Sequence, residues 1–209
     1  MNANPRRSIG ILLTSATLLF GLAACGGNSD DTTSPEPAQP ESTASAMETA
    51  DAGAQTFGPG CPAIPKSGPG SFNGMIKDPV ATAASNNPLL STLVTAVTKA
   101  GLVDTLNQAD GLTVFAPTND AFAKIPAADL AAVLADKEKL TAILTHHVVS
   151  GQLDPEEVVG DHDTLNKDSV TVTGDDTDMK VDDASVICGN IPTANATVYV
   201  IDTVLMPGM

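Results

Sequence analysis

Three histidines are the side chains of this sequence best suited to metal or proton chemistry: His146, His147 and His162. A neutral imidazole can bind a metal ion or accept a proton near neutral pH. Adjacent histidines point to opposite faces of a strand, and on a helix they lie roughly 100° apart. The sequence contains no Cys-x-x-Cys and no His-Glu-x-x-His, so no third ligand stands at a zinc-site spacing. We expect no metal and no cofactor, and a structural, hydrogen-bonded His147, with metal or acid–base work as the alternative.

Carboxylates form two groups in the C-terminal half, at Asp161 and Asp163 and within residues 175–183. A calcium loop repeats Asp-x-Asp-x-Asp-Gly before a later Glu, and neither group follows that pattern. We expect solvated turns there, with weak binding of a divalent cation as the alternative. The sequence has no Gly-x-Ser-x-Gly, and prolines interrupt its glycine-rich segments at 58–60 and 68–70. The sequence therefore predicts no catalytic residue and no enzyme. The alternative is a pair of catalytic carboxylates that only the fold brings together.

The charge of the chain restricts its partners. Asp plus Glu number 25 against 10 Lys plus Arg, which gives a formal net charge of −15. A polyanion is repelled by nucleic-acid phosphates and by anionic lipid headgroups. We expect no nucleic-acid partner and no electrostatic docking on membranes. Aromatic residues make up only 3% of the chain, so its core must consist of Ala, Val, Leu and Ile.

Residues 1–24 have the pattern of an export signal. Arg6 and Arg7 precede an apolar run at 9–22, which is short for a membrane span. The run ends in Leu22-Ala23-Ala24-Cys25, which resembles a bacterial lipobox, so we expect Cys25 to be the lipidated first residue of the mature protein. The protein is then exported and anchored to the outer face of the plasma membrane or cell envelope, and this anchor is its membrane contact. The alternative is a plain signal peptide with an incidental cysteine.

Residues 25–55 are predicted to be a disordered tether. After Cys25 they are rich in Ser, Thr, Pro and acidic residues, and Met47 is their one large apolar side chain. Such a segment buries too little surface to offset the entropy lost when its backbone becomes ordered. A flexible chain of this length reaches on the order of 30 Å, which suits a tether that holds a domain clear of a membrane.

Cys61 and Cys188 are the two cysteines left once Cys25 is lipidated. Export places them in an oxidising compartment, where disulfides form and persist. We therefore predict a Cys61–Cys188 disulfide, with two separate buried thiols as the alternative.

Residues 56–209 are predicted to form one α+β domain, with helices in its first half. Asp-Pro at 78–79 and Asn-Pro at 87–88 have the form of helix starts, in which a capping side chain precedes a proline. Gly101 ends the helix that follows the second of them. Two more short helices are expected around 130–134 and 140–144.

The second half of this domain has the period of strands. Val and Thr alternate at 170–173 before a turn at 174–176, and further short β-rich runs lie at 179–181, 186–188 and 198–204. Helices followed by antiparallel strands favour an α+β domain over an alternating parallel sheet. An earlier strand at 112–116 must then join the same sheet from a distance in sequence.

Two segments resemble the signatures of fasciclin (FAS1) domains: TVFAPTNDAF at 113–122 and ATVYVIDTVLMP at 196–207. Between them, LTHHVV at 144–149 is similar to the family's Tyr-His motif, with His147 on the histidine and His146 where tyrosine is usual. NNPL at 86–89 and the cysteine-bearing flanks further resemble the fasciclin-type secreted and lipoprotein antigens of mycobacteria. The resemblance implies a mostly antiparallel, wedge-shaped sheet packed with short helices, in which His147, Tyr199 and Asp202 have structural roles.

The resemblance also implies a function in adhesion, through binding of extracellular protein, matrix or carbohydrate. We expect the exposed residues around the signatures to carry that binding: Thr118, Asn119 and Asp120 at one corner, and His146 in its loop. The alternative is a carrier of a small apolar or lipid ligand, which would occupy an apolar crevice between the helices and the sheet.

Overall fold

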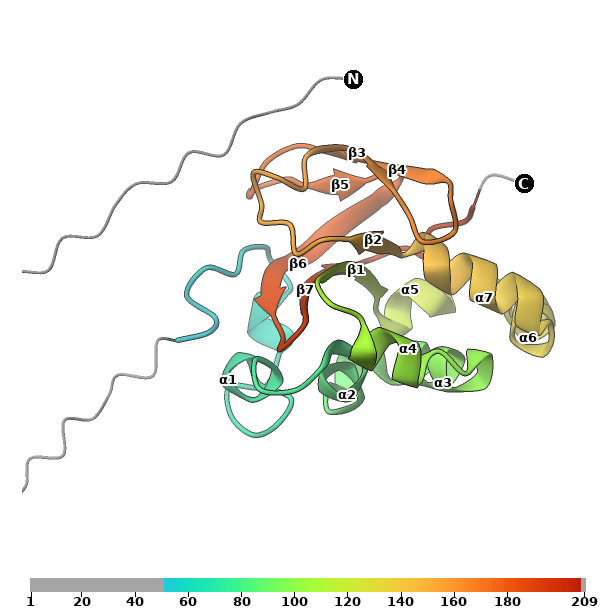
Figure 1. The fold of residues 1–209 in the computed structure, drawn as a ribbon, viewed down its shortest axis with the longest axis horizontal. Coiled ribbons are helices and arrows are strands. Elements are labelled where there is room, and N and C mark those ends of the chain that lie inside the picture. The colour runs from blue at the N-terminus through green and yellow to red at the C-terminus, as the bar shows by residue number, and fades with distance from the viewer. Residues whose placement is uncertain (1–50, 208–209) are drawn as a thin grey trace, which may run out of the picture. The chain divides into compact units, whose positions relative to one another are not determined.

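The computed structural model describes residues 51–207, in which helices cover one side of a sheet (Figure 1). Cys25 and the export signal lie outside the described residues, as does the tether up to residue 50. The segment 51–55, which we predicted to belong to the tether, forms turns that bond to the rest of the described chain. The amide of Ala52 donates to Oδ1 of Asn73 at 3.0 Å, and Thr56 Oγ1 donates to the carbonyl of Gly53 at 2.7 Å.

The described residues contain seven α-helices, two short 3-10 helices and seven strands. The helices are η1 (Cys61–Ala63), α1 (Phe72–Met75), α2 (Val80–Ser85), η2 (Pro88–Leu90), α3 (Ser91–Ala100), α4 (Val103–Gln108), α5 (Asn119–Ala123), α6 (Ala127–Ala135) and α7 (Lys137–His146). The strands are β1 (Leu112–Pro117), β2 (Val148–Ser150), β3 (Gly160–Asp163), β4 (Ser169–Thr173), β5 (Lys180–Val181), β6 (Ala184–Pro192) and β7 (Ala196–Ile201). Within this part of the chain, no helix has the length and apolar character that a membrane crossing requires.

The strands form one sheet in the order β2-β1-β7-β6-β5-β4-β3. The pair β1–β7 is parallel, and the other neighbouring pairs for which a register is defined are antiparallel. The prediction of an α+β domain with a mostly antiparallel sheet is confirmed. The strand predicted at 112–116 also joins this sheet from a distance, since β1 pairs with β7 from Leu112–Ala196 to Pro117–Ile201.

The central strand β7 separates two hydrophobic cores. Val198 and Val200 face the first core, which the helices cover, whereas Tyr199 and Ile201 face the second. In Figure 1, β3, β4 and β5 lie on the side of β7 away from α1–α4, and valines of β4 and β5 belong to the second core. A strand that is buried on both faces needs apolar side chains at consecutive positions, which explains the unbroken apolar run in the sequence.

The predicted helix starts have different outcomes. Asn87 Oδ1 accepts the amide of Leu89 at 3.0 Å and caps η2, which leads directly into α3, and Gly101 ends α3 in the left-handed conformation. Asp78 does not cap α2, so that prediction was wrong. The helix begins at Val80 without a side-chain cap from its neighbour, and Asp78 Oδ2 instead accepts from Asn86 Nδ2 at 3.2 Å.

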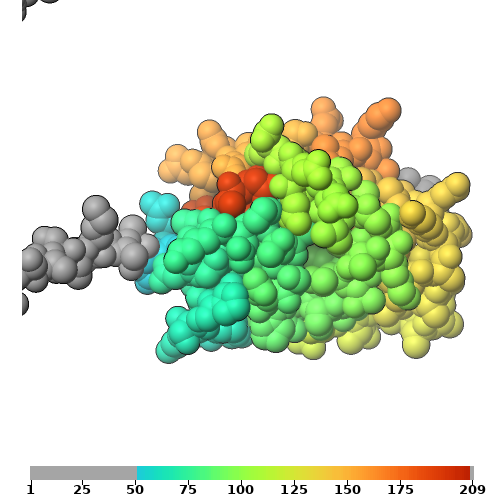
Figure 2. Space-filling view, turned by 60° about the horizontal axis from the view of Figure 1, so that its bottom comes forward, coloured from blue at the N-terminus to red at the C-terminus, as the bar shows by residue number. Residues whose placement is uncertain are grey.

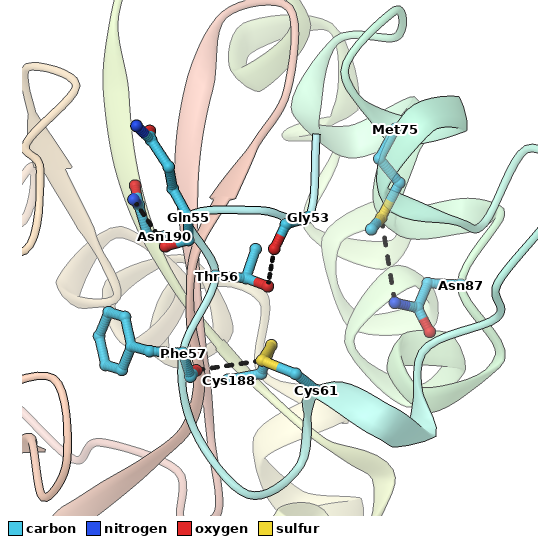
Figure 3. Close-up of a disulfide and its surroundings, with 9 residues drawn as sticks. All are labelled: Gly53, Gln55, Thr56, Phe57, Cys61, Met75, Asn87, Cys188 and Asn190. Carbon is cyan, nitrogen blue, oxygen red and sulfur yellow. Dashed lines mark hydrogen bonds between the residues drawn. A yellow bond between two sulfur atoms is a disulfide. The ribbon is translucent and has the colours of Figure 1, made fainter. Parts of the chain in front are cut away.

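The predicted disulfide is present between Cys61 in η1 and Cys188 in β6 (Figure 3). It fixes the N-terminal segment of the domain against a strand that follows 127 residues later. Beside it, Phe57 forms an isolated bridge with Gly189, and its ring centroid lies 6.3 Å from that of Tyr199. A Cβ atom at Gly189 would lie 2.3 Å from the ring of Phe57, so glycine is needed for this close approach.

Candidate functional site

His147 is a buried link between the Tyr-His motif and the second signature. The residue is 2% exposed and follows the last residue of α7. Its Nδ1–H donates to the carbonyl of Ile143 at 2.7 Å, and its Nε2 accepts the amide of Leu205 at 3.0 Å. Burial lowers the pKa of His147 to about 4, so the ring is neutral at physiological pH. Both ring nitrogens are occupied inside the protein, which is the structural role expected from the sequence.

His146 is buried as well, so the prediction that it lies in an exposed interaction loop was wrong. The residue is 3% exposed and ends α7. Its Nδ1 lies 2.7 Å from Oδ1 of Asp168, in the turn between β3 and β4. Because an ionised carboxylate only accepts hydrogen bonds, Nδ1 carries the proton in this pair. His146 therefore connects the end of a helix to a turn inside the protein.

Asp168 is the centre of a small polar cluster around His146. Its carboxylate accepts hydrogen bonds from the hydroxyl of Thr164 and, at 2.7 Å, from Nδ2 of Asn166. Partial burial on its own raises the pKa of Asp168, but the hydrogen bonds from Thr164, His146 and Asn166 outweigh it and lower the pKa to about 2. The cluster links the β3–β4 turn to the end of α7.

The corner of the first signature is mostly structural. Thr118 is 6% exposed, and its hydroxyl caps α5 by accepting the amide of Ala121 at 3.2 Å. Asn119 Oδ1 accepts the amide of Thr92 at 2.9 Å at the start of α3, and its Nδ2 donates to the carbonyl of Pro88. Because Thr118 is buried, the prediction that it binds a partner was wrong. Asn119 is half-buried, and its part in binding stays a prediction. Asp120 is exposed, as expected.

In the second signature, Tyr199 and Asp202 each have a defined hydrogen-bond partner. Tyr199 is fully buried, and its hydroxyl donates to the carbonyl of Leu153 at 3.1 Å. Burial raises the pKa of Tyr199, as do the nearby carboxylates of Asp154 and Glu157. Asp202 accepts the amide of Ser185 at 2.9 Å.

Asp202 also joins the two signatures at the surface. Its Oδ2 lies 3.0 Å from Nζ of Lys124, which directly follows α5, and the two side chains are 36% and 53% exposed. Partial burial by itself raises the pKa of Asp202, but hydrogen bonds from Lys124, the Ser185 amide and Thr203 hold it below its ordinary value. Lys124, Asp202 and Thr203 thus form a polar group of side chains. Together with Asp120 in the first turn of α5, we call it the signature corner.

The acidic group at 175–183 lies in turns, whereas Asp161 and Asp163 lie in β3, so the turn predicted for these two residues was wrong. Asp175 Oδ1 accepts the amide and the hydroxyl of Thr177, and Asp182 Oδ1 accepts the amide of Thr171 at 3.0 Å. Across residues 51–207, no group of three His, Cys, Asp or Glu side chains is placed to hold a metal ion.

Comparison with known proteins gives a clear family assignment. The family model described as "Fasciclin domain" matches residues 88–207, which include both signature segments. The chain belongs to the fasciclin family. Its fasciclin domain is preceded by the disulfide-linked segment that contains Cys61.

Relatives in mycobacteria match beyond the fasciclin domain. "Cell surface glycolipoprotein MPB83" of Mycobacterium bovis is 44% identical over 99% of this chain and 97% of its own length. "Immunogenic protein MPT70" of Mycobacterium tuberculosis is 52% identical over 72% of this chain and 81% of its own length. Among solved structures, a FAS1 domain pair from the insect cell adhesion molecule Fasciclin I matches 56% of this chain and 45% of its own, at 24% identity and a TM-score of 0.48.

Sequence reasoning missed two polar residues that organise the fasciclin domain. Asp168 lies 22 residues after His146, and no short-range spacing connects them. Asn195 Oδ1 accepts the amide of Val80 at 2.9 Å, and its Nδ2 donates to the carbonyl of Leu106 at 2.8 Å. One signal was available for His146, since a histidine at the tyrosine position of a buried motif needs a new polar partner.

Proposed function

We propose that this protein is an exported, lipid-anchored adhesion module that acts by binding and not by turnover. The observation that carries the proposal is the 44% identity to a protein named a cell surface glycolipoprotein, over 99% of this chain. That similarity includes the N-terminal region, where Leu22-Ala23-Ala24-Cys25 resembles a lipobox. In this proposal, Cys25 carries the lipid and the tether displays the fasciclin domain at the outer face of the cell envelope.

The signature corner is the surface that we assign to binding. Of the four side chains expected to bind a partner, Asp120 alone is exposed. Lys124, at the C-terminal end of the same helix, and Asp202 add one charge of each sign, and both are more than a third exposed. Exposed carboxylate and ammonium groups of this kind suit polar contacts with an extracellular protein or with carbohydrate hydroxyls.

Anchoring is tested by replacing the cysteine. Cys25→Ala should move the protein from the detergent phase to the aqueous phase in a phase-partition experiment on cells that export it. Cys61→Ala combined with Cys188→Ala removes the other cysteines and should leave the protein in the detergent phase. A Cys25→Ala protein that stays in the detergent phase would refute lipid anchoring.

Binding is tested by adhesion to immobilised matrix proteins and to cells. Asp120→Ala should weaken attachment, whereas Asp129→Ala should not, because Asp129 is also an exposed aspartate in the first turn of a helix but lies on α6. Thermal melts of both variants should match the parent, since neither carboxylate is buried. Equal attachment of the parent and Asp120→Ala would remove the signature corner from the proposal. A pull-down with the purified protein from envelope and host extracts would then identify the surface in use.

A further inference from the structure

An apolar recess opens among the helices of the fasciclin domain. It lies between α2, α3 and α4 on one side and β1, β2 and the end of α7 on the other, and has a volume of about 60 Å³. Figure 2 looks onto the helical face, where the surface dips between these green helices. Val80, Ala84, Val94, Val97, Leu106 and Leu165 are among the residues that line it.

The recess continues into the first core. A void of about 30 Å³ shares Val80, Ala84, Leu93 and Val114 with it as lining residues. A second void, of about 20 Å³, shares Leu144 and His147 with the recess. Protein cores are close-packed and contain few such voids. The layer between helices and sheet therefore contains three neighbouring spaces that share lining residues.

Few polar side chains line these spaces: the hydroxyl of Thr105 lies at the exposed rim, and the polar side chains further inside are hydrogen-bonded within the protein. Both ring nitrogens of His147 are occupied, and Thr145 Oγ1 donates to the carbonyl of Thr141 at 2.8 Å. In the adjoining void, Thr193 Oγ1 bonds to Ala196 and Asn87 Oδ1 accepts from Leu89. A ligand with polar groups would lose its own hydrogen bonds to water on entering. The recess therefore favours a hydrocarbon.

The wall formed by α4 is the least buried side of the recess. Among the described residues, α4 has no fully buried side chain, and Leu102, Val103 and Leu106 pack half-buried against the first core. Its C-terminal end is attached to α2, because Asn107 Oδ1 accepts the amide of Ala81 at 3.0 Å. Apolar side chains that remain half-exposed on a helix gain contact area when a hydrocarbon covers them.

We propose that the recess binds the end of one unbranched alkyl chain. Its volume of about 60 Å³ is well below the roughly 300–1,000 Å³ of pockets that enclose whole drug-sized ligands, so a fused ring system does not fit. A single chain end fits the narrow space, and its first methylenes would lie against Ala84 and Val97. The adjoining voids give a longer chain room to advance when the side chains between them rotate.

A single tryptophan at the rim can report this binding in the full-length protein. The chain has no Trp, so Thr105→Trp on the exposed side of the recess introduces the one indole, and brominated ligands quench indole fluorescence on contact. The probes are n-alkanols of butyl to decyl length with bromine on the terminal carbon. Quenching should saturate, and the dissociation constant should fall about fourfold for each added methylene until the chain fills the available space.

Three variants serve as controls. Val159→Trp places the indole on an exposed residue that does not line the recess, and its quenching should not saturate. In the Thr105→Trp protein, Ala84→Leu should weaken binding by about 16- to 60-fold, because it fills the space of two to three methylenes. Ala128→Leu on the exposed side of α6 should not change it. If melts show that Ala84→Leu does not fold, Ala81→Leu at the same recess replaces it.

The proposal is overturned if quenching is unsaturable and equal at both tryptophan positions, or if it is independent of chain length. It is also overturned if a folded Ala84→Leu protein binds like the parent.

Vesicles of phosphatidylcholine with brominated acyl chains distinguish the source of the chain. Saturable quenching by vesicles assigns the site to a membrane lipid, whereas quenching by alkanols alone assigns it to a free aliphatic molecule. The inference stands apart from adhesion, because Asp120→Ala tests one and Ala84→Leu the other.

Discussion

His146 Nδ1 and Asp168 Oδ1 lie 2.7 Å apart, although 22 residues separate them in the chain. The pair joins the last residue of α7 to the turn between β3 and β4. His146 is buried, and Asp168 also accepts hydrogen bonds from Thr164 and Asn166. Removal of either member of the pair would therefore leave the other without this hydrogen bond. His146, one of the four residues predicted to bind a partner, therefore has a structural role.

Removing this pair should destabilise the domain. We expect His146→Ala and Asp168→Ala each to lower the free energy of unfolding by about 1–3 kcal/mol, because each leaves a buried or partly buried group unpaired. Urea unfolding of the single variants and the double variant measures their coupling. Asp163→Ala, at an exposed position of β3, should have little effect. Additive losses in the double variant would show that the two side chains do not interact.

The same pair should give stability a dependence on pH in acid. The folded-state pKa of Asp168 is about 2, below the ordinary value of 3.8, so its contribution is complete above pH 4 and is lost as the pH falls toward 2. The carboxylate is 31% exposed, which reduces the contribution to about 1–2 kcal/mol. Unfolding curves of the parent should lose more stability between pH 4 and pH 2 than those of Asp168→Asn. Parallel losses in both proteins would contradict the assigned pKa.

His147 should control stability at a higher pH. Its folded-state pKa is about 4 against 6.5 in the unfolded chain, so the unfolded state takes up the proton first. Stability is then complete above about pH 6.5 and is lost as the pH falls to 4, by about 3 kcal/mol in total. His147→Gln should be less stable than the parent at neutral pH and should show a smaller change from pH 7 to pH 4.5. Thermal melts at both pH values test this, and a variant with the parent's full pH dependence would exclude His147 as its source.

Loss of the Cys61–Cys188 disulfide should act mainly on the unfolded state. The chain-entropy relation for a separation of 127 residues gives a stabilisation of about 5 kcal/mol, which is an upper figure. Replacing both cysteines with Ala, or reducing the parent, should shift the urea midpoint downward to a similar extent. Labelling of the denatured, non-reduced protein with a thiol reagent checks the bridge directly. Reaction at Cys61 or Cys188 would show that the bridge had not formed.

The sequence predicted the fold through patterns that depend on near neighbours. The Asn87 cap, the left-handed Gly101 and the apolar run of β7 each follow from local backbone preference or from burial on both faces of a strand. The two cysteines could be paired because they were the remaining candidates in an oxidising compartment. These features need no knowledge of where distant segments lie.

The candidate site was harder to predict because its side chains depend on distant partners. Thr118 and Asn119 have the polar character of surface residues, yet both serve helix starts, and Asn119 caps a helix that lies earlier in the chain. Asp78 has the form of a cap, but Asn86 offers its carboxylate a competing hydrogen bond. Polar type alone cannot distinguish a cap from a binding residue, because both functions use the same oxygen and amide groups.

Asn195 gives a last prediction, since Asn195-Ala196-Thr197 has the form of an N-glycosylation acceptor. Its Oδ1 accepts the amide of Val80, and its Nδ2 donates at 2.8 Å to Leu106 and at 2.9 Å to Ala109. A glycan on Nδ2 would replace one of the two hydrogen atoms that make these bonds. It would also have to fit between α4 and the β6–β7 turn that contains Asn195. We therefore expect the folded protein to remain unmodified at Asn195 when it is made in a eukaryotic secretory system.

Asn195→Ala should lower the free energy of unfolding by about 3 kcal/mol, roughly 1 kcal/mol for each of the three hydrogen bonds. Thr197→Val is the matched control, because it removes the acceptor triplet, keeps a β-branched residue in β7 and leaves the Asn195 amide in place. In urea unfolding, the stability of Thr197→Val should be close to that of the parent, and that of Asn195→Ala should be well below it. Mass spectrometry measures whether Asn195 carries a glycan. Full glycosylation of a stably folded parent would show that Asn195 is not held between α2 and α4.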